Sequence, residues 1–223
     1  MKKSLFAEAV LKFLSGVMLV GVLIFLPAGT FRFFGGWLLM GILFLPMFCA
    51  GLLMLKKNPN LLRSRLDAKE SRKNQDTVVK LSGLMFIAGF VVAGLDFRFG
   101  WLPLPAWVSY AAAVVFLIAY ILYAEVLREN AYLSRTIEVQ EGQTVVSTGL
   151  YGIVRHPMYA VTLLLFLSMP FVLGSVYSFL CFLPYPFLIA KRLLDEEVFL
   201  EKELHGYADY KKKVKYRLIP GIW

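Results

Sequence analysis

The feature that most constrains this chain is a set of five long, continuous apolar runs. They cover about residues 9–28, 33–55, 77–96, 106–127 and 157–190. The first four have about the length that a helix needs to cross a bilayer, and their apolar residues are consecutive, unlike the alternating strands of a membrane β-barrel. Of the 223 residues 59% are hydrophobic, a larger fraction than a water-soluble domain needs. The sequence therefore predicts an all-α, multi-pass integral membrane protein.

The last apolar run is too long for one crossing. As a single helix, 157–190 would measure about 51 Å, against a hydrocarbon core of about 30 Å. Gly174 and Ser175 near its middle form a natural break. We therefore expect a helical hairpin with two slightly short legs, and about six membrane-embedded helices in all. Pro184 and Pro186 are expected to bend the second leg, because proline removes a backbone donor and crowds the preceding turn.

Basic residues are concentrated in alternate connectors, which indicates how the chain is oriented. The N-terminus, the segments 56–80 and 128–156 and the tail from 191 carry them, whereas the two remaining connectors hold only Arg32 and Arg98. Since cytoplasmic loops are enriched in Lys and Arg, we expect both termini and a C-terminal helix in the cytoplasm, in a membrane such as the bacterial inner membrane. The net charge of +9 then reflects topology and anionic lipid, and does not indicate a nucleic-acid partner.

Metal and disulfide chemistry have little support in this sequence. The two cysteines, Cys49 and Cys181, lie inside apolar runs and are interpreted as small core hydrophobes. Together with His156 and His205 they form no credible zinc cluster. The first apolar run lacks a following small-residue cleavage pattern, so we expect it to be retained as a span.

The chain divides into two regions by the residues it carries. Residues 1–127 contain four apolar spans without an embedded charge of evident chemical meaning, and Asp96 and Arg98 are expected at the membrane interface. Residues 128–223 hold nearly all the chemically suggestive groups, and two short runs around Glu141–Gln143 predict a β-hairpin over 136–147. Close helix packing is the expected role of the small residues in the second and third spans: Gly35, Gly36, Gly41, Gly51, Gly83, Gly89 and Gly94.

A polar motif stands at the start of the last apolar run. Arg155 and His156 precede Pro157, and Glu196–Glu197 follow the run. Charged groups at a membrane helix are costly and usually functional. The structural alternative is a proline helix start with an anchoring Arg, and a solvated acidic face. Opposite charges flanking one hairpin favour a zwitterionic ligand, although the residues alone leave both explanations open.

The motif is part of a longer pattern. Its pieces are Gly149-x-Tyr151-x-x-x-Arg155-His156-Pro157-x-Tyr159, Glu196-Glu197, Gly206-Tyr207-x-x-Tyr210 and Val214-x-x-Arg217-x-Ile219-Pro220. Over about residues 130–223 this pattern resembles the isoprenylcysteine carboxyl methyltransferase family and, more loosely, the phospholipid N-methyltransferases grouped with it. The resemblance implies that S-adenosylmethionine binds among the C-terminal helices, with the tail closing over it. Leu150 stands where that family often has proline, which implies only a less rigid turn.

The resemblance also implies which residues form the site. Arg155 and Glu197 would be the catalytic pair, and the cofactor site would be built from Tyr151, Arg155, His156, Pro157, Tyr159, Glu196, Glu197, Tyr207 and Tyr210. Methyl transfer is an in-line displacement, so positioning should dominate catalysis. Glu197 or Glu196 suits the ammonium of the cofactor, and Arg155 suits a carboxylate, either the cofactor's or the substrate's.

The same chemistry bears on the acceptor. His156 and the N–H groups at the Pro157 helix start suit adenine or a carboxylate. A carboxylate acceptor needs no general base, whereas an amine needs one. The sequence offers no dedicated base, which favours O- or S-methylation.

The sequence thus predicts an integral-membrane, S-adenosylmethionine-dependent methyltransferase for a lipophilic acceptor, with carboxyl O-methylation preferred over phospholipid N-methylation or thiol S-methylation. The acceptor is expected to enter from the bilayer and the cofactor from the cytoplasm. The alternative enzyme is an NADPH-dependent reductase of the sterol type, which shares an Arg-His-Pro helix start, although no Gly-x-Gly-x-x-Gly motif follows a strand. The non-enzymatic alternative is a transport or scaffold protein whose charges only anchor it.

Overall fold

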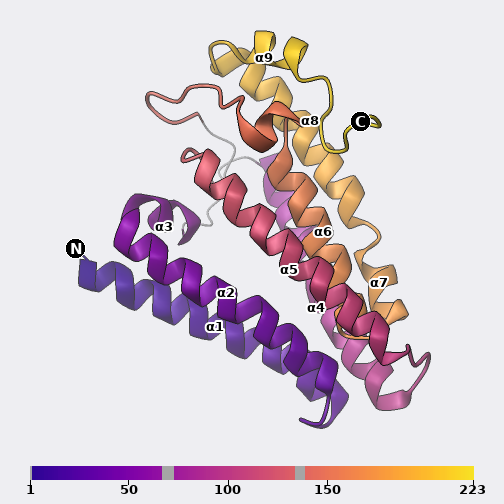
Figure 1. The fold of residues 1–223 in the computed structure, drawn as a ribbon. Coiled ribbons are helices and arrows are strands. Elements are labelled where there is room, and N and C mark those ends of the chain that lie inside the picture. Colours follow the sequence, from indigo (N-terminus) through magenta and orange to yellow (C-terminus); the bar gives the residue numbers. More distant parts are fainter. Residues whose placement is uncertain (1, 67–72, 134–138) are drawn as a thin grey trace.

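A computed structural model describes residues 2–66, 73–133 and 139–223, and within these ranges the chain is helical without a strand. Figure 1 shows α1 and α2 as a pair beside the larger group of α4 to α8. The helices are α1 (Lys2–Ala28), α2 (Phe34–Lys57), α3 (Pro59–Leu66), α4 (Lys73–Phe99), α5 (Ala106–Glu129), the 3-10 helix η1 (Gly149–Gly152), α6 (Pro157–Val172), α7 (Val176–Phe182), α8 (Tyr185–Glu203) and α9 (Tyr207–Lys213). The predicted all-α fold is confirmed.

Within the described ranges, five segments are long and apolar enough to cross a membrane. They are Leu5–Ala28, Phe34–Lys57, Thr77–Phe99, Ala106–Glu129 and Val176–Glu203. With 16 residues, α6 is shorter than the roughly 20 residues of a full crossing, as expected for a short hairpin leg. The expectation of an integral membrane protein therefore has direct support, and the number of crossings stays a prediction.

The last apolar run breaks where the sequence predicts, and once more. Gly174 has a φ of +73°, a backbone conformation that favours glycine, and Ser175 caps α7 by accepting a hydrogen bond from the Ser178 N–H at 3.0 Å. At the bend expected from Pro184 and Pro186 the leg is interrupted, because one helix ends just before Pro184. α7 stops at Phe182 and α8 begins anew with Pro186 in its first turn, since two prolines so close together deny the backbone donors that would continue α7.

The two ends of the bundle are populated differently. In Figure 1 the N-terminus, α3, the described part of the segment between α5 and α6, and α9 all lie at one end of the bundle. The turns between α1 and α2, between α4 and α5, and between α6 and α7 lie at the other. The basic connectors of the sequence are thus grouped at one end, and their cytoplasmic location stays a prediction.

Several glycines bring helices into close contact. A Cβ on Gly89 would lie 2.2 Å from the Phe182 ring, and one on Gly94 would lie 2.5 Å from the Ile24 carbonyl oxygen. Gly35 likewise faces the backbone of Leu173. These positions confirm the packing role that small residues have in membrane helices. The interpretation is wrong for three others, which have no neighbouring atom within 4 Å of a Cβ position: Gly41, Gly51 and Gly83.

Asp96 is buried inside the protein, which the sequence did not predict, and its place at the membrane interface stays a prediction. Its side chain is 4% exposed. It accepts hydrogen bonds from the Ser175 hydroxyl at 2.5 Å and from the Leu102 N–H at 3.2 Å. The carboxylate therefore joins the end of α4 to the turn between α6 and α7 and to the start of the α4–α5 turn. These hydrogen bonds give the buried carboxylate the partners that a buried polar group needs.

Two smaller predictions also need correction. Of the expected hairpin over 136–147, residues 136–138 lie outside the described residues, and 144–147 form no strand. The described part is a turn closed by a hydrogen bond from the Gln143 N–H to the Gln140 carbonyl at 3.0 Å. Both cysteines are free, but Cys49 is exposed on α2 and Cys181 is only partly buried, so neither is a core residue.

Candidate active site

The approach to α6 is fixed by the end of α5. Gly149 begins η1 with a φ of +50°, and a Cβ there would collide with the Glu129 carboxylate. That carboxylate accepts a hydrogen bond from the Leu150 N–H at 3.0 Å. After η1 the chain turns into α6, with His156 as the N-cap residue and Pro157 in the first turn. The predicted helix start is confirmed, and Pro157 is suited to it because its missing N–H is not needed there.

The C-terminal tail is bound to this helix start. The Arg155 and His156 N–H groups donate to the Tyr216 and Arg217 carbonyls, both at 2.9 Å. The Arg155 guanidinium donates from Nη1 to two more tail carbonyls, those of Val214 and Lys215, at 2.8 Å each. Four hydrogen bonds to consecutive tail residues hold the tail across the entrance of α6.

Arg155 and Glu197 come together as the sequence predicts, but they bind each other. Arg155 Nε donates to Glu197 Oε1 at 2.6 Å, and Arg217 Nε donates to Oε2 at 3.0 Å. His156 Nε2 lies 3.3 Å from Oε1. Glu197 is only 2% exposed, so these cations compensate a carboxylate that burial would otherwise disfavour. Both oxygens of Glu197 already have charged partners within the protein.

Three tyrosines connect the tail helix α9 to this network. The Tyr210 hydroxyl donates to the Tyr151 carbonyl at 2.7 Å, and the Tyr207 hydroxyl lies 3.4 Å from His156 Nε2. The Tyr151 hydroxyl accepts a hydrogen bond from Asn130 Nδ2 at 3.1 Å. Burial raises the pKa of all three phenols, and the Glu197 carboxylate raises the pKa of Tyr207 further. They are therefore neutral at physiological pH.

The second acidic residue of the pair has a different environment. Glu196 Oε2 accepts a hydrogen bond from the Tyr159 hydroxyl, and that hydroxyl accepts one from Arg192 Nε at 3.1 Å. Arg192, Tyr159 and Glu196 thus form a row of alternating donor and acceptor groups. Arg192 was not predicted as a site residue, although its position four residues before Glu196 puts both on one face of α8.

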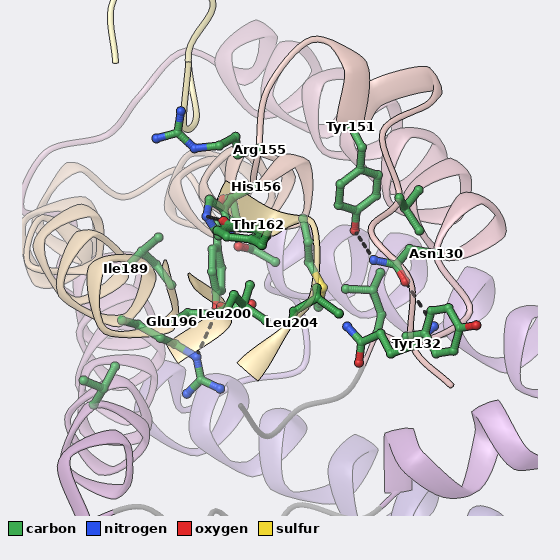
Figure 2. A pocket seen from close by; sticks show the side chains of 18 of the residues that line it. Asn130, Tyr132, Tyr151, Arg155, His156, Thr162, Ile189, Glu196, Leu200 and Leu204 are labelled. Atoms are coloured by element: carbon green, nitrogen blue, oxygen red, sulfur yellow. Dashed lines mark hydrogen bonds between the residues drawn. The ribbon is translucent and has the colours of Figure 1, made fainter. Parts of the chain in front are cut away.

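A cavity of about 480 Å³ lies between these elements, within the range of roughly 300–1,000 Å³ that is typical of ligand sites. Figure 2 shows Arg155, His156 and Glu196 on one side of it and Asn130 and Tyr151 on another. Seven of the nine predicted site residues line it, namely Tyr151, Arg155, His156, Tyr159, Glu196, Tyr207 and Tyr210. Pro157 and Glu197 do not line it, and Glu197 acts on it through the cations that it binds.

The rest of the wall is largely apolar. α4 contributes Val78 and Phe86, α6 contributes Phe166, and α8 contributes Ile189 and Leu200. A cavity with one charged wall and one hydrocarbon wall suits an amphiphilic ligand or two ligands of different polarity. Among the described residues, no group of three or more His, Cys, Asp or Glu side chains is arranged to hold a metal ion.

Comparison with known proteins identifies the region that carries these features. A family model for phospholipid methyltransferases matches residues 106–205, which run from the start of α5 to just past the end of α8. The C-terminal region carries the pattern of that family. This confirms the predicted resemblance.

A curated relative has a different printed activity. The Delta(14)-sterol reductase TM7SF2 of Mus musculus is 32% identical over 91 residues, which is 40% of this chain. The aligned segment spans only 22% of the length of that reductase. The likeness is therefore local.

Proposed function

We propose that this protein is an integral-membrane, S-adenosylmethionine-dependent methyltransferase that modifies a lipophilic acceptor. The observation that supports this most is the cavity, in which Glu196, His156 and three buried tyrosines face an apolar wall. A zwitterionic cofactor requires the polar side and a lipophilic acceptor requires the apolar side. When bound, the cofactor supplies an electrophilic methyl group, and the residues described here position both reactants.

We assign different tasks to the two acidic residues, on the basis of their contacts. Glu196 lines the cavity and is the carboxylate that we assign to the cofactor's ammonium, through a charge-assisted hydrogen bond. Glu197 holds Arg155 and Arg217, and its role in catalysis is to position the tail and the helix start. Arg155 lines the cavity but directs its donors to Glu197 and the tail, so it too acts mainly by positioning.

The acceptor that we assign carries a carboxylate. His156 lies within hydrogen-bond distance of Glu197, and Glu196 accepts a hydrogen bond from Tyr159, so neither is arranged as a dedicated base. A carboxylate is already ionised at neutral pH and attacks the methyl group without one. An amine of a phospholipid headgroup would need deprotonation first, and a thiol would need ionisation, so these acceptors rank second.

Ligand binding and methyl transfer test the proposal. S-adenosylmethionine and its demethylated product should raise the melting temperature of the purified protein in detergent, because any ligand of the native state stabilises it. Radiolabelled methyl groups should then appear in lipid extracted from membranes incubated with the protein. Glu201, which pairs with Lys211 at 2.8 Å on the exposed side of α8, offers a matched control, and Glu201→Gln should retain both responses.

A reductase is the second candidate, favoured by the local identity with the sterol reductase. It would bind reduced nicotinamide dinucleotide phosphate. If that nucleotide raises the melting temperature and the adenosyl compounds do not, the methyltransferase proposal is wrong. If neither class of ligand binds to well-folded protein, the remaining interpretation is a scaffold or transport protein.

A further inference from the structure

The third membrane helix contributes to the wall of the cavity. Val78, Ser82 and Phe86 follow one another at four-residue spacing, and Val79 and Gly83 form a second row beside them. Residues four apart share one face of a helix, so a continuous stripe of α4 borders the cavity. This stripe lies outside the region that the family model matches.

Gly83 differs from the other glycines of α4. Gly89 and Gly94 are pressed against Phe182 and the backbone of α1, whereas a Cβ on Gly83 would have no atom within 4 Å. Glycine in a helix interior costs about 1 kcal/mol relative to alanine, and helix packing does not explain that cost here. The cavity that Gly83 lines, and not a neighbouring helix, is therefore the feature that explains why this position has no side chain.

The same position meets the surface of the bundle. Gly83 is exposed, and Val79, one turn before it, is 46% exposed. Both lie within the segment Thr77–Phe99, which is long and apolar enough to cross a membrane, so we expect this surface to face hydrocarbon. The cavity therefore reaches the lipid-facing side of α4 where a side chain is missing, while its charged wall lies on α6 and α8.

We infer that Gly83 is a specificity-determining residue, which leaves open a lateral passage for one long hydrocarbon chain of the acceptor. The inference rests on the proposed function for the identity of the acceptor. The chain would lie along Gly83 and Phe86 toward lipid, and its carboxylate head would point to the Arg192 side of the polar wall. The occupant is thus an amphiphile with an anionic head and a single apolar tail.

A side chain at position 83 tests this passage. Gly83→Leu should weaken the binding of a fluorescent palmitate analogue at least tenfold, because leucine fills the space that the chain requires. Butyrate has the same head and almost no tail, so it should displace the analogue neither from the native protein nor from Gly83→Leu. Gly83→Ala should have a smaller effect. The thermal shift with S-adenosylmethionine should be unchanged in both variants, since the polar wall is untouched.

Gly41→Leu is the matched control. Gly41 is also exposed, also has an empty Cβ position, and lies on α2 outside the cavity. The inference is overturned if Gly83→Leu binds palmitate as Gly41→Leu does, or if the native protein does not bind it. If S-adenosylmethionine binds to none of the variants, the proposed methyl transfer fails, and the palmitate comparison still decides whether the passage exists.

Discussion

Asp96 and Glu197 are both buried carboxylates, one at each end of the helical bundle, but they have different partners. Asp96 accepts hydrogen bonds from a serine hydroxyl and a backbone N–H. Glu197 accepts from two guanidinium groups and lies beside a histidine. The exposed fractions of the two residues, 4% and 2%, are nearly equal, so burial alone does not separate a structural carboxylate from a functional one.

The difference lies in what the partners of each carboxylate border. The partners of Asp96 bind other residues of the protein. The Ser175 Oγ accepts a hydrogen bond from the Ser178 N–H, and the Ser178 hydroxyl donates one to the Gly89 carbonyl. None of these residues lines the cavity. Arg155 and His156 do line it. A buried carboxylate therefore indicates a site in this protein only where the cations that it holds face a cavity.

The largest expected effect concerns the sides of the membrane on which the two ends lie. Single cysteines at Gln143 and Lys212, in a background without Cys49 and Cys181, should react only with reagent supplied from the cytoplasm. A cysteine at Arg32, in the turn between α1 and α2, should react only from the opposite side. This all-or-none result follows from the enrichment of Lys and Arg in cytoplasmic connectors. Labelling of Gln143 and Arg32 from the same side would disprove the opposition of the two ends.

Removal of the carboxylate at the cavity end should be the most destabilising substitution. Glu197→Ala leaves Arg155 buried without its acidic partner, and breaking a buried ion pair in this way costs about 3–5 kcal/mol. Chemical denaturation in detergent measures the loss, and limited proteolysis should show release of the tail after Lys213. Glu201→Ala removes an exposed pair and should cost about 0–1 kcal/mol. Equal stability of the two variants would mean that the network does not hold the tail.

The sequence predicted the components of this network better than their contacts. The apolar runs, the Pro157 helix start and the meeting of Arg155 with Glu197 follow from periodicity and from the return of a hairpin to one membrane face. The pairing of Arg217 with Glu197 is a tertiary contact that spacing alone does not specify. The burial of Asp96 was missed for the same reason, because its partner Ser175 is 79 residues away in sequence.

The neighbouring acidic residue should affect ligand binding and leave the fold intact. Glu196→Gln removes the charge that faces the cavity, and loss of one charge-assisted hydrogen bond should weaken S-adenosylmethionine binding by about 1.5–3 kcal/mol. Isothermal titration measures the affinity, and the melting temperature without ligand should stay near that of the native protein. Unchanged affinity in Glu196→Gln, with a loss in the matched Glu201→Gln control, would place the ammonium site elsewhere on α8.

The carboxylate at the far end should show the reverse behaviour. Asp96→Ala leaves the Ser175 hydroxyl and the Leu102 N–H without their acceptor, and unsatisfied buried groups cost about 1–3 kcal/mol. We expect lower stability, with the affinity for S-adenosylmethionine the same as in the native protein. A loss of affinity comparable to that of Glu196→Gln would show that the two ends are coupled.

The smallest effect concerns pH, and only the cavity end should show it. Burial raises the pKa of Tyr151, Tyr207 and Tyr210, so the folded state favours their neutral form. Their contribution to stability is complete below the ordinary tyrosine pKa of about 10. It is lost as the pH rises above that value, because the phenols ionise at a lower pH in the unfolded state than in the folded state. Proteolysis of the tail should therefore accelerate above about pH 10.

Tyr210→Phe removes one titrating group and the hydrogen bond to the Tyr151 carbonyl. It should therefore cost about 0.5–1.5 kcal/mol of stability at neutral pH and weaken the dependence of stability on alkaline pH. Asp96→Ala should keep the full dependence, since Asp96 makes no contact with these tyrosines, and an equal loss in both variants would contradict the separation of the two ends.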